Sequence, residues 1–541
     1  MPKSNSRVLL SSVFGPFTVD DEFGSRAINP MELYQNQVTR AQTPFSLRMH
    51  HRSWGIMLIQ HNISAPTTVL DFPSRERFVE ELTSHSYAVV GISGIIVNIG
   101  KVREMCRLVR RHSPRSTLVV GGHVTAIPGV ERLLDADHIV KGEGIRWFRQ
   151  FLGEPVDAPI SHPAIPSSFG FRLMGVKPPA GGGERSATIV PSVGCPMGCT
   201  FCTTSSFFGG KGKFVNFYET GAQLFEVMRN VEQRLNVRTF FVMDENFLLY
   251  KKRAMELLSE MKRHEKAWSL YVFSSANAIR KYSMRELVEL GVSWVWMGLE
   301  SPRATYEKLK GTETIALTRE LQAHGIRVQG STIVGLEHHT PDNLSSEIDH
   351  AVAHEADFHQ FMLYTPVPGT PLHAEMTKAG RMIEGVDPAD IHGQFKFNFR
   401  HAHIDRDASK SWLDLAFQRD YDVNGPSLFR MMRTMFTGWR RFKADQDPRV
   451  RARVAAESAR LRGGYGAALW AMERYLAANA DVSAKIRELR RDIEHEFGAW
   501  SKIVNRSAGE LLLWTARREA AVYPGGRPLE PRTFVDRRNW R

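Results

Sequence analysis

Short apolar runs that end in or near glycine, separated by amphipathic helical stretches, recur along this 541-residue chain. In the first third, strand-like runs cover residues 55–59, 87–93, 116–122 and 137–142, and helical patterns cover 74–84, 99–112 and 129–134. A second series of strand-then-helix units starts near residue 187. Continuous apolar strands that alternate with helices are typical of parallel sheets covered by helices. The sequence therefore predicts an α/β fold.

The length of 541 residues allows two or three domains, each with its own core. We predict four segments, in this order: an N-terminal Rossmann-like, doubly wound domain (1–152), a linker rich in proline and glycine (153–185), a central partial (β/α)6 barrel of the TIM type (186–399), and a helical C-terminal domain with an irregular basic tail (400–541). Ligands of such folds bind beyond the carboxyl ends of the strands, so these ends are the first place to look for a site.

Three of the four cysteines stand in one short segment, at Cys195, Cys199 and Cys202. A four-iron cluster usually takes four cysteine ligands, so three thiolates would leave one iron open, much as a catalytic zinc keeps an open position. A structural zinc site is the alternative, but zinc usually needs a second ligand pair, and we see no such Cys or His pair nearby. The fourth cysteine, Cys106, lies in the predicted helix 99–112 and is interpreted as a small core residue.

The spacing of these cysteines, with Phe201 just before the last one, resembles the signature of the radical S-adenosylmethionine enzymes. The resemblance implies that Cys195, Cys199 and Cys202 hold a 4Fe-4S cluster whose open iron chelates S-adenosylmethionine. An electron from the cluster would then cleave this cofactor and generate a deoxyadenosyl radical. We also expect a reducing partner such as a flavodoxin or a ferredoxin.

Later strand ends resemble the cofactor-binding motifs of the same family, in the same order, over residues 187–375. The resemblance places S-adenosylmethionine against Asp244, Glu245, Ser275, Asn277, Glu300, Ser301, Gly330, Ile333 and Gly335. The acidic residues at 244 and 245 would face its amino group, and the alternative is a helix N-cap at Asp244 or Asn246. Because an unpaired buried carboxylate is costly, Glu300 needs a partner, either the cofactor or an internal arginine.

The N-terminal third is similar to the cobalamin-binding domain that precedes the barrel in one class of this family. The resemblance rests on Gly-Gly-His at 121–123 and Lys-Gly-Glu-Gly at 141–144. It implies cobalamin contacts from Gly91, Ser93, Gly121, Gly122, His123, Gly142 and Glu143. The usual Asp-x-His-x-x-Gly motif, whose histidine ligates cobalt, is missing. Either cobalamin is held without such a histidine or the domain no longer binds it, and tight turns would also explain the glycines.

Residues 428–443 combine apolar side chains at helical spacing with arginines. This pattern predicts an amphipathic helix with three alternative roles: packing on the barrel, a soft substrate wall made by Met431, Met432 and Met435, or peripheral contact with a membrane. Further charged helices are expected over 449–462, 463–478 and 481–497, followed by an irregular tail from residue 523.

The net charge of +13 favours acidic partners but does not choose among them. No apolar run approaches the roughly 20 residues needed to cross a bilayer, and the few cysteines fit a reducing cytoplasm. We predict an enzyme that transfers a methyl group, with the help of cobalamin, to an unactivated carbon of a small-molecule or lipid substrate. No general acid or base can be assigned from the sequence.

Three alternatives remain. The first is a radical cyclase or oxidoreductase that works with or without cobalamin. The second is a methylthiotransferase acting on transfer RNA, which would need a second cysteine set where only Cys106 is found; this argues against a nucleic-acid partner. The third is a carrier of metal or cobalamin without catalysis, which the ordered barrel motifs disfavour.

Overall fold

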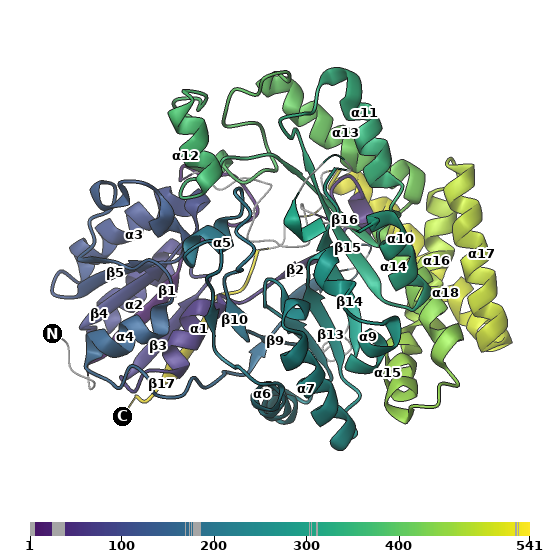
Figure 1. Cartoon of the computed structure of the whole chain (residues 1–541), viewed down its shortest axis with the longest axis horizontal. Helices are drawn as coiled ribbons and strands as arrows, with labels where there is room; N and C mark the ends of the chain where they lie inside the picture. The colour runs from purple at the N-terminus through teal and green to yellow at the C-terminus, as the bar shows by residue number, and fades with distance from the viewer. Residues whose placement is uncertain are drawn as a thin grey trace.

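Two sheets of mainly parallel strands lie side by side, and a bundle of helices packs beyond the second sheet (Figure 1). The computed structural model describes residues 6–23, 38–167, 169–172, 174, 176, 186–301, 303, 306–309, 312–524, 527 and 530–540. The glycine run of the predicted linker, 181–183, lies outside these residues.

The N-terminal sheet has the strand order β17-β3-β1-β4-β5-β6. Its strands are β1 (Val8–Ser12), β3 (Thr67–Asp71), β4 (Val89–Ser93), β5 (Thr117–Gly121), β6 (His138–Ile139) and β17 (Phe534–Arg538). Its helices are α1 (Trp54–His61), α2 (Arg75–Ser84), α3 (Ile99–His112) and α4 (Gly144–Leu152). One core lies between the sheet and α2 and α3, and another between the sheet and α1 and α4. Helices on both faces make this sheet doubly wound, as the sequence predicts.

Two predictions for this domain are wrong. Residues 55–59, expected as a strand, belong to helix α1, and the strand β3 was not expected. The helix α1 buries Ile56, Met57, Leu58 and Gln60, so its run of apolar residues shows no helical period that could distinguish it from a buried strand. In addition, the helical pattern over 129–134 forms only the short 3-10 turn Val130–Arg132.

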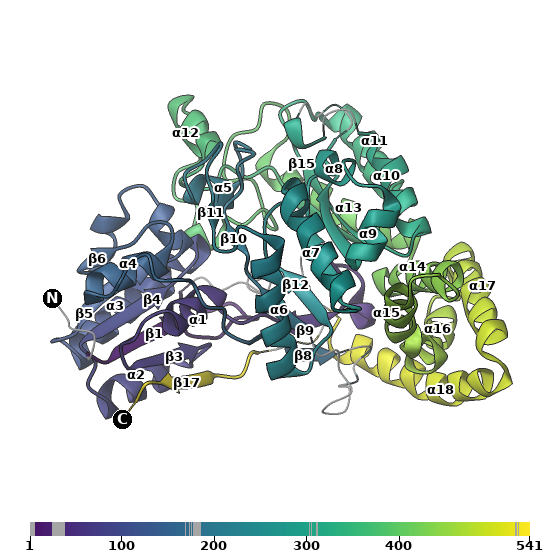
Figure 2. The same cartoon turned by 60° about the horizontal axis from the view of Figure 1, so that its bottom comes forward.

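The C-terminal tail corrects a further expectation, because it is not irregular throughout. Strand β17 pairs antiparallel with β3 and becomes the edge of the N-terminal sheet, where Figure 2 shows it beside β3. Glu530 accepts hydrogen bonds from the backbone N–H groups of Phe17 and Thr18, and Arg537 contacts the buried carboxylate of Glu81. The last residues of the chain therefore close the first domain.

The second sheet has the order β16-β15-β14-β13-β12-β9-β7. Its six parallel strands are β9 (Ser186–Ile189), β12 (Thr239–Val242), β13 (Ser269–Phe273), β14 (Val292–Gly298), β15 (Arg327–Val334) and β16 (Phe358–Leu363). The short β7 (Ile165–Pro166) pairs antiparallel with β9. In this strand order β16 and β9 are not neighbours, so the barrel is partial and open on one side.

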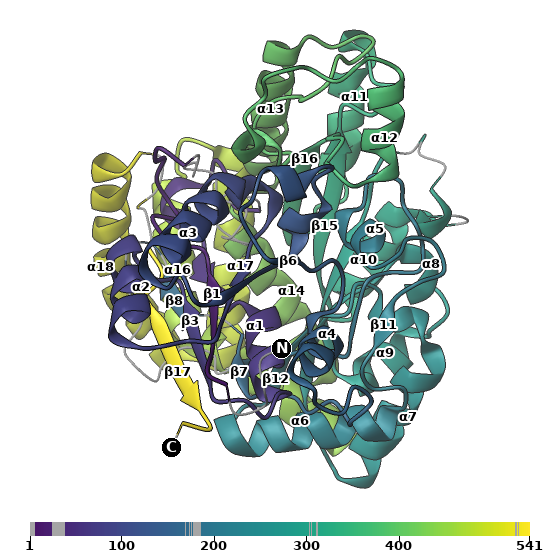
Figure 3. The same ribbon diagram turned by 90° about the vertical axis from the view of Figure 1, so that its left-hand side faces the viewer.

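The helices of the barrel are α6 (Gly221–Leu235), α7 (Lys251–Arg263), α8 (Ala276–Ile279), α9 (Met284–Leu290), α10 (Thr314–Ala323), α11 (Pro341–Val352) and α12 (Pro371–Lys378). Two small antiparallel pairs complete the strands: β10 (Ser192–Val193) with β11 (Val215–Asn216), and β2 (Arg48–His50) with β8 (Phe169–Arg172). Viewed from the side of the N-terminal sheet, the parallel strands of the barrel stand behind that sheet (Figure 3).

The C-terminal region is helical: α13 (Arg406–Asn424), α14 (Ser427–Phe442), α15 (Pro448–Ser458), α16 (Gly464–Tyr475), α17 (Ala480–Phe497) and α18 (Ala499–Val522). Helix α14 is covered by the barrel and by α17, and Met431, Met432 and Met435 lie in a core with Phe358 of β16 and Ile486 of α17. Packing on the barrel is thus confirmed, and the apolar face of this helix is buried in that core. None of the described helices is both long and apolar enough to cross a membrane.

Candidate active site

The cysteine segment forms a tight loop between β10 and the short helix α5 (Thr203–Phe207). The Ser205 backbone N–H donates to Cys202 Sγ over 3.4 Å, and the Ser205 hydroxyl donates to the Cys195 carbonyl over 2.7 Å. Gly198 has φ +69°, and a Cβ atom there would lie 2.6 Å from Cβ of Lys211, so the loop needs glycine at this position. These contacts hold three half-buried free thiols in one turn of chain.

The donor set fits a cluster that has one open position. Burial raises the pKa of Cys195 to about 12 and also raises the pKa values of Cys199 and Cys202. Since iron and zinc bind the thiolate, a bound metal would have to displace these protons. The fourth cysteine, Cys106, is buried in α3 of the first domain. Three thiols, without a fourth cysteine beside them, match a 4Fe-4S cluster with one exchangeable iron.

Asp244 and Glu245, predicted as a pair, lie at the end of β12 but have different surroundings. Asp244 is buried, forms an ion pair with Arg253 of α7 and accepts the Asn246 backbone N–H. Glu245 lines a cavity, and no described residue donates a hydrogen bond to it. Burial, with a smaller contribution from Asp244, raises the pKa of Glu245 to about 7. Only Glu245 is therefore available to a ligand, whereas the carboxylate of Asp244 is used inside the fold.

Ser275 and Asn277 lie at the end of β13 and join Asn246 in one polar network. The Asn246 side-chain amide donates to Ser275 Oγ over 3.0 Å, and the Ser275 hydroxyl lies 2.7 Å from Asn277 Oδ1. These bonds fix the ends of β12 and β13 beside each other.

Glu300 at the end of β14 has an internal cationic partner, but it is a lysine rather than the arginine considered above. The carboxylate of Glu300 forms an ion pair with Lys308, while its Oε2 atom is buried and has no hydrogen-bond partner among the residues that the structure describes. Burial alone would lower the pKa of Lys308, but Glu300 and the nearby Cys199 outweigh it and raise that pKa. A Cβ at Gly298 would lie 2.7 Å from Lys308 Nζ, so this glycine makes room for the pair. The ammonium group also lies 5.2 Å from the ring of Phe201, against the cysteine loop.

With the exception of Gly330, which lies in the middle of β15, the remaining residues predicted around the cofactor lie at neighbouring strand ends. Ser301 donates to Glu347 of α11, and Ile333 is half-buried on β15. Packing explains the glycine of β15 and the glycine that follows the strand: a Cβ at Gly330 would lie 2.4 Å from Leu299, and one at Gly335, where φ is +80°, would lie 2.3 Å from Phe397. The structure therefore brings the predicted positions to one edge of the barrel.

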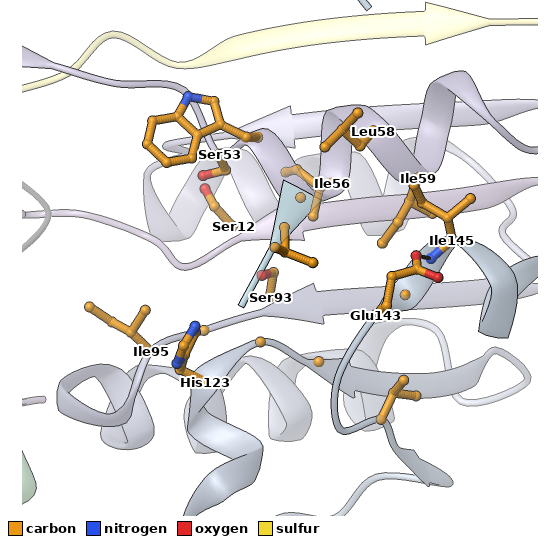
Figure 4. A pocket seen from close by; sticks show the side chains of 18 of the residues that line it. Ser12, Ser53, Ile56, Leu58, Ile59, Ser93, Ile95, His123, Glu143 and Ile145 are labelled. Carbon is orange, nitrogen blue, oxygen red and sulfur yellow. Dashed lines mark hydrogen bonds between the residues drawn. The ribbon is translucent and has the colours of Figure 1, made fainter. Parts of the chain in front are cut away.

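A cavity of about 490 Å³ lies between the N-terminal sheet and the residues that flank the cysteine loop, Val193 and Thr204 among them. Figure 4 shows Ser93, His123 and Glu143 around it. All of the predicted cobalamin positions line it: Gly91, Ser93, Gly121, Gly122, His123, Gly142 and Glu143. The barrel side contributes Glu245, Met243 and the aromatic residues Phe207, Phe208 and Phe217. Of the residues predicted around S-adenosylmethionine, Glu245 lines this space.

The glycines that line this cavity differ in what they do. A Cβ at Gly121 or Gly142 would meet no atom within 4 Å, so these positions leave open space for a ligand. By contrast, a Cβ at Gly122 would lie 2.5 Å from the Gly94 carbonyl, and one at Gly91 would lie 2.8 Å from Leu10. Gly122 and Gly91 are therefore explained by the fold itself. The cradle formed at Gly121 and Gly142 fits a flat, bulky group that approaches the backbone closely.

His123 and Glu143 make contacts with the protein as well as lining the cavity. The His123 ring stacks on Phe207 of α5 at 4.4 Å between centroids, and burial lowers its pKa to about 4. The Glu143 carboxylate accepts the backbone N–H groups of Ile145 and Arg146 and so caps helix α4.

Sequence reasoning missed Lys308 and Arg253, the internal partners of Glu300 and Asp244. Arg253 lies in the helix that follows the strand of Asp244, so a search for a cation in the next helix could have found it. Lys308 lies in the 3-10 turn Glu307–Leu309, for which the sequence carries no periodic signal.

Comparison with known proteins finds two domain families in the order of the two sheets. Residues 57–152 match the B12 binding domain, and residues 189–351 match the radical SAM superfamily. Over 220 residues the chain is 31% identical to the bacteriochlorophyllide d C-12(1)-methyltransferase of Chlorobaculum tepidum, a match that covers 39% of this chain and 46% of that protein. The hopanoid C-2 methylase of Rhodopseudomonas palustris is 24% identical over 36% of this chain and 38% of its own length. In both cases the chain matches less than half of the relative.

The fold also resembles a solved structure, that of the radical S-adenosylmethionine methyltransferase TsrM from Kitasatospora setae with cobalamin and a [4Fe-4S] cluster bound. The two chains are 17% identical, with a TM-score of 0.51 over 84% of this chain and 99% of the other. The likeness extends across both sheets and confirms the fold class. The chain thus contains a match to the B12 binding domain followed by a match to the radical SAM superfamily.

Proposed function

We propose that this protein is a cobalamin-dependent methyltransferase that uses S-adenosylmethionine and a 4Fe-4S cluster. The observation that carries the proposal is the single cavity between the cradle of Gly121 and Gly142 and helix α5, which begins directly after Cys202. A cobalamin in this cavity would lie beside a cluster on the cysteine loop. The names of the curated relatives, which are methyltransferases and a methylase, support transfer of a methyl group.

Cys195, Cys199 and Cys202 would hold the cluster, and the hydrogen bonds from Ser205 would keep their loop in the shape that binds it. When bound, these groups supply one-electron cleavage of S-adenosylmethionine and a carrier for its methyl group. The cation of Lys308, held against Phe201, favours thiolate at Cys199. The half-buried position of the loop limits the access of water.

Glu245 is the carboxylate that we assign to the amino group of S-adenosylmethionine. It lines the cavity and has no internal partner in the described part of the chain, whereas Asp244 forms an ion pair with Arg253. The buried Oε2 atom of Glu300, to which no described residue donates a hydrogen bond, offers a second acceptor at the next strand but one. A hydrogen bond from a ligand ammonium or hydroxyl group would satisfy both carboxylates.

The substrate that we propose is a small molecule or a lipid, reached through the open side of the barrel. The reductant would be a flavodoxin or a ferredoxin, and the protein would act in the cytoplasm. The domain boundaries after residues 152, 185 and 399 remain predictions.

Anaerobic reconstitution tests the proposal. Wild-type protein loaded with iron, sulfide and hydroxocobalamin should retain about one cobalamin and cleave S-adenosylmethionine once a reductant is added. Cys199→Ala should lose the iron and the cleavage but keep cobalamin, because it leaves the cavity intact. Cys106→Ala, in α3, is the matched control and should retain both. Cleavage without bound cobalamin would favour a cobalamin-free cyclase or oxidoreductase instead.

A further inference from the structure

Three titratable side chains near the carboxyl ends of β14 and β15 have no role in the proposed function. His338, His339 and Glu347 bring their ligand-type atoms within 4.8 Å of one another. Both His339 and Glu347 are buried, with 2% and 7% of their surface exposed. His338 and His339 lie in the turn after β15, which also carries Gly335, and Glu347 lies in α11, where it contacts Ser301 of the turn after β14.

The hydrogen bonds of this cluster decide against a metal site. The Nδ1 atom of His339 accepts the backbone N–H groups of Gly335 and Leu336, over 3.0 and 3.3 Å. A neutral imidazole that accepts at Nδ1 carries its proton on Nε2, which then has no lone pair for a metal. Burial lowers the pKa of His339 to about 3, so the ring is neutral. The Nε2–H group is therefore a hydrogen-bond donor.

This donor lies close to the carboxylate of Glu347. The Nε2 atom of His339 lies 4.0 Å from Glu347 Oε2 and has no hydrogen-bond partner among the described residues. The same carboxylate oxygen accepts the hydroxyl of Ser301 over 2.8 Å. Ser301 Oγ in turn accepts the Arg303 backbone N–H, over 3.1 Å, and lies 3.0 Å from His338 Nε2. If the distance between His339 Nε2 and Glu347 Oε2 shortened by about 1 Å, the two groups would form a charge-assisted hydrogen bond.

We propose that His339 and Glu347 form a positioning couple that ties the turn after β14 to the turn after β15. His339 holds the backbone of the β15 turn, and Glu347 holds the β14 turn through Ser301. The inference rests on the proposed function for its ligand, because these turns would then hold the nucleoside part of S-adenosylmethionine. Neither residue touches the cofactor itself; they act through the turns.

Conservative variants separate the two halves of the couple. His339→Asn keeps an acceptor near the Gly335 and Leu336 amides but removes the donor toward Glu347, whereas His339→Ala removes both. Glu347→Gln keeps an acceptor for the Ser301 hydroxyl, and Glu347→Ala does not. Asp342→Asn, an exposed carboxylate on the same helix α11, is the matched control.

The first measurement is hydrogen exchange in the protein without cofactors, which does not depend on the proposed function. We expect exchange at Gly335 and Leu336 to quicken by about 10-fold in His339→Ala, since a buried hydrogen bond is lost, and to be restored largely in His339→Asn. Unchanged exchange in a folded His339→Ala protein would overturn the couple. If that variant does not fold, Glu347→Ala and Glu347→Gln are compared instead. Exchange at the Ser301 and Arg303 amides should be faster in Glu347→Ala than in Glu347→Gln, and equal exchange in the two variants would overturn the couple.

The second measurement is the affinity of the cluster-loaded enzyme for S-adenosylhomocysteine. We expect Kd to rise by about 10-fold in Glu347→Ala, to recover in part in Glu347→Gln, and to stay unchanged in Asp342→Asn. The KM for S-adenosylmethionine should rise more than kcat falls. Wild-type protein that neither binds nor cleaves the S-adenosyl compounds would contradict the proposed function, while the exchange data would still decide the couple. Stoichiometric zinc that is lost in His339→Ala would overturn the hydrogen-bonded arrangement.

Discussion

The ring of His123 stacks on the ring of Phe207, with their centroids 4.4 Å apart and their planes 21° apart. His123 follows β5 of the N-terminal sheet. Phe207 is the last residue of helix α5, which begins directly after Cys202. This contact joins the two domains beside the cavity that they share. Both rings line that cavity.

Replacing His123 by phenylalanine should keep the stacked contact and make the stability less dependent on pH. Burial lowers the pKa of His123 to about 4, while an unfolded histidine titrates near 6.5. Between these values the unfolded chain binds a proton that the folded chain does not, so the free energy of unfolding decreases as pH falls. Urea denaturation from pH 7.5 to 5 should therefore show a flatter dependence in His123→Phe. The exposed control His495→Ala should follow wild type, and equal slopes for wild type and His123→Phe would contradict the account.

Asp244→Asn and Glu245→Gln should have opposite effects although the residues are adjacent. Asp244→Asn leaves Arg253 buried beside a neutral amide, which costs about 3–5 kcal/mol of stability. Glu245→Gln removes a carboxylate whose pKa burial raises to about 7, so the wild type loses stability on going from about pH 4.5 to pH 7 and the variant does not. Denaturant titrations of wild type and of the two variants at pH 5 and pH 8 check both expectations.

The control for this pair is Glu226→Gln, which breaks an exposed ion pair with Arg229 and should change stability by less than about 0.5 kcal/mol. If Glu245→Gln were as destabilising as Asp244→Asn, Glu245 would have an internal partner and would not be free for a ligand.

Deleting residues 530–541 should destabilise the first domain although these residues end the chain. The deletion exposes the edge of β3 and removes the contacts of Glu530 with Phe17 and Thr18. At about 0.5–1.5 kcal/mol for each buried hydrogen bond, we expect a loss of at least about 2 kcal/mol. Arg532→Ala, an exposed change in the same segment, should have little effect. A truncated protein that melts like wild type would show that β17 adds nothing to the sheet.

The parts of the fold that the sequence predicts are those encoded by local patterns. Short apolar runs ending in glycine located β4 and β5, and the cysteine loop together with the ordered strand-end motifs located the six parallel strands of the barrel. Gly121 and Gly142 were predicted because a glycine at a strand end is informative even when its neighbours are unknown. The same argument could not distinguish them from Gly91, which packs against Leu10.

The parts that the sequence could not predict depend on contacts between distant segments. Nothing in residues 534–538 indicates that β3 will be their partner, and β3 itself has no terminal glycine. The apolar run at 55–59 suits a strand or a helix equally, and only its burial against α4 and the sheet decides for a helix. The partner of Glu300 is a lysine in an irregular segment, which no periodicity marks.

The most direct test fills the cavity at Gly121. This residue has an ordinary backbone conformation and no atom within 4 Å of the place where a Cβ would stand, so Gly121→Leu should fold normally. The measurement is the cobalamin retained after gel filtration of anaerobically reconstituted protein, with Gly464→Leu in α16 as the matched control. We predict about one cobalamin per chain in wild type and in Gly464→Leu, and almost none in a folded Gly121→Leu protein that still carries its iron. Equal retention by all three proteins, or none by wild type, would contradict the assignment of this cavity to cobalamin.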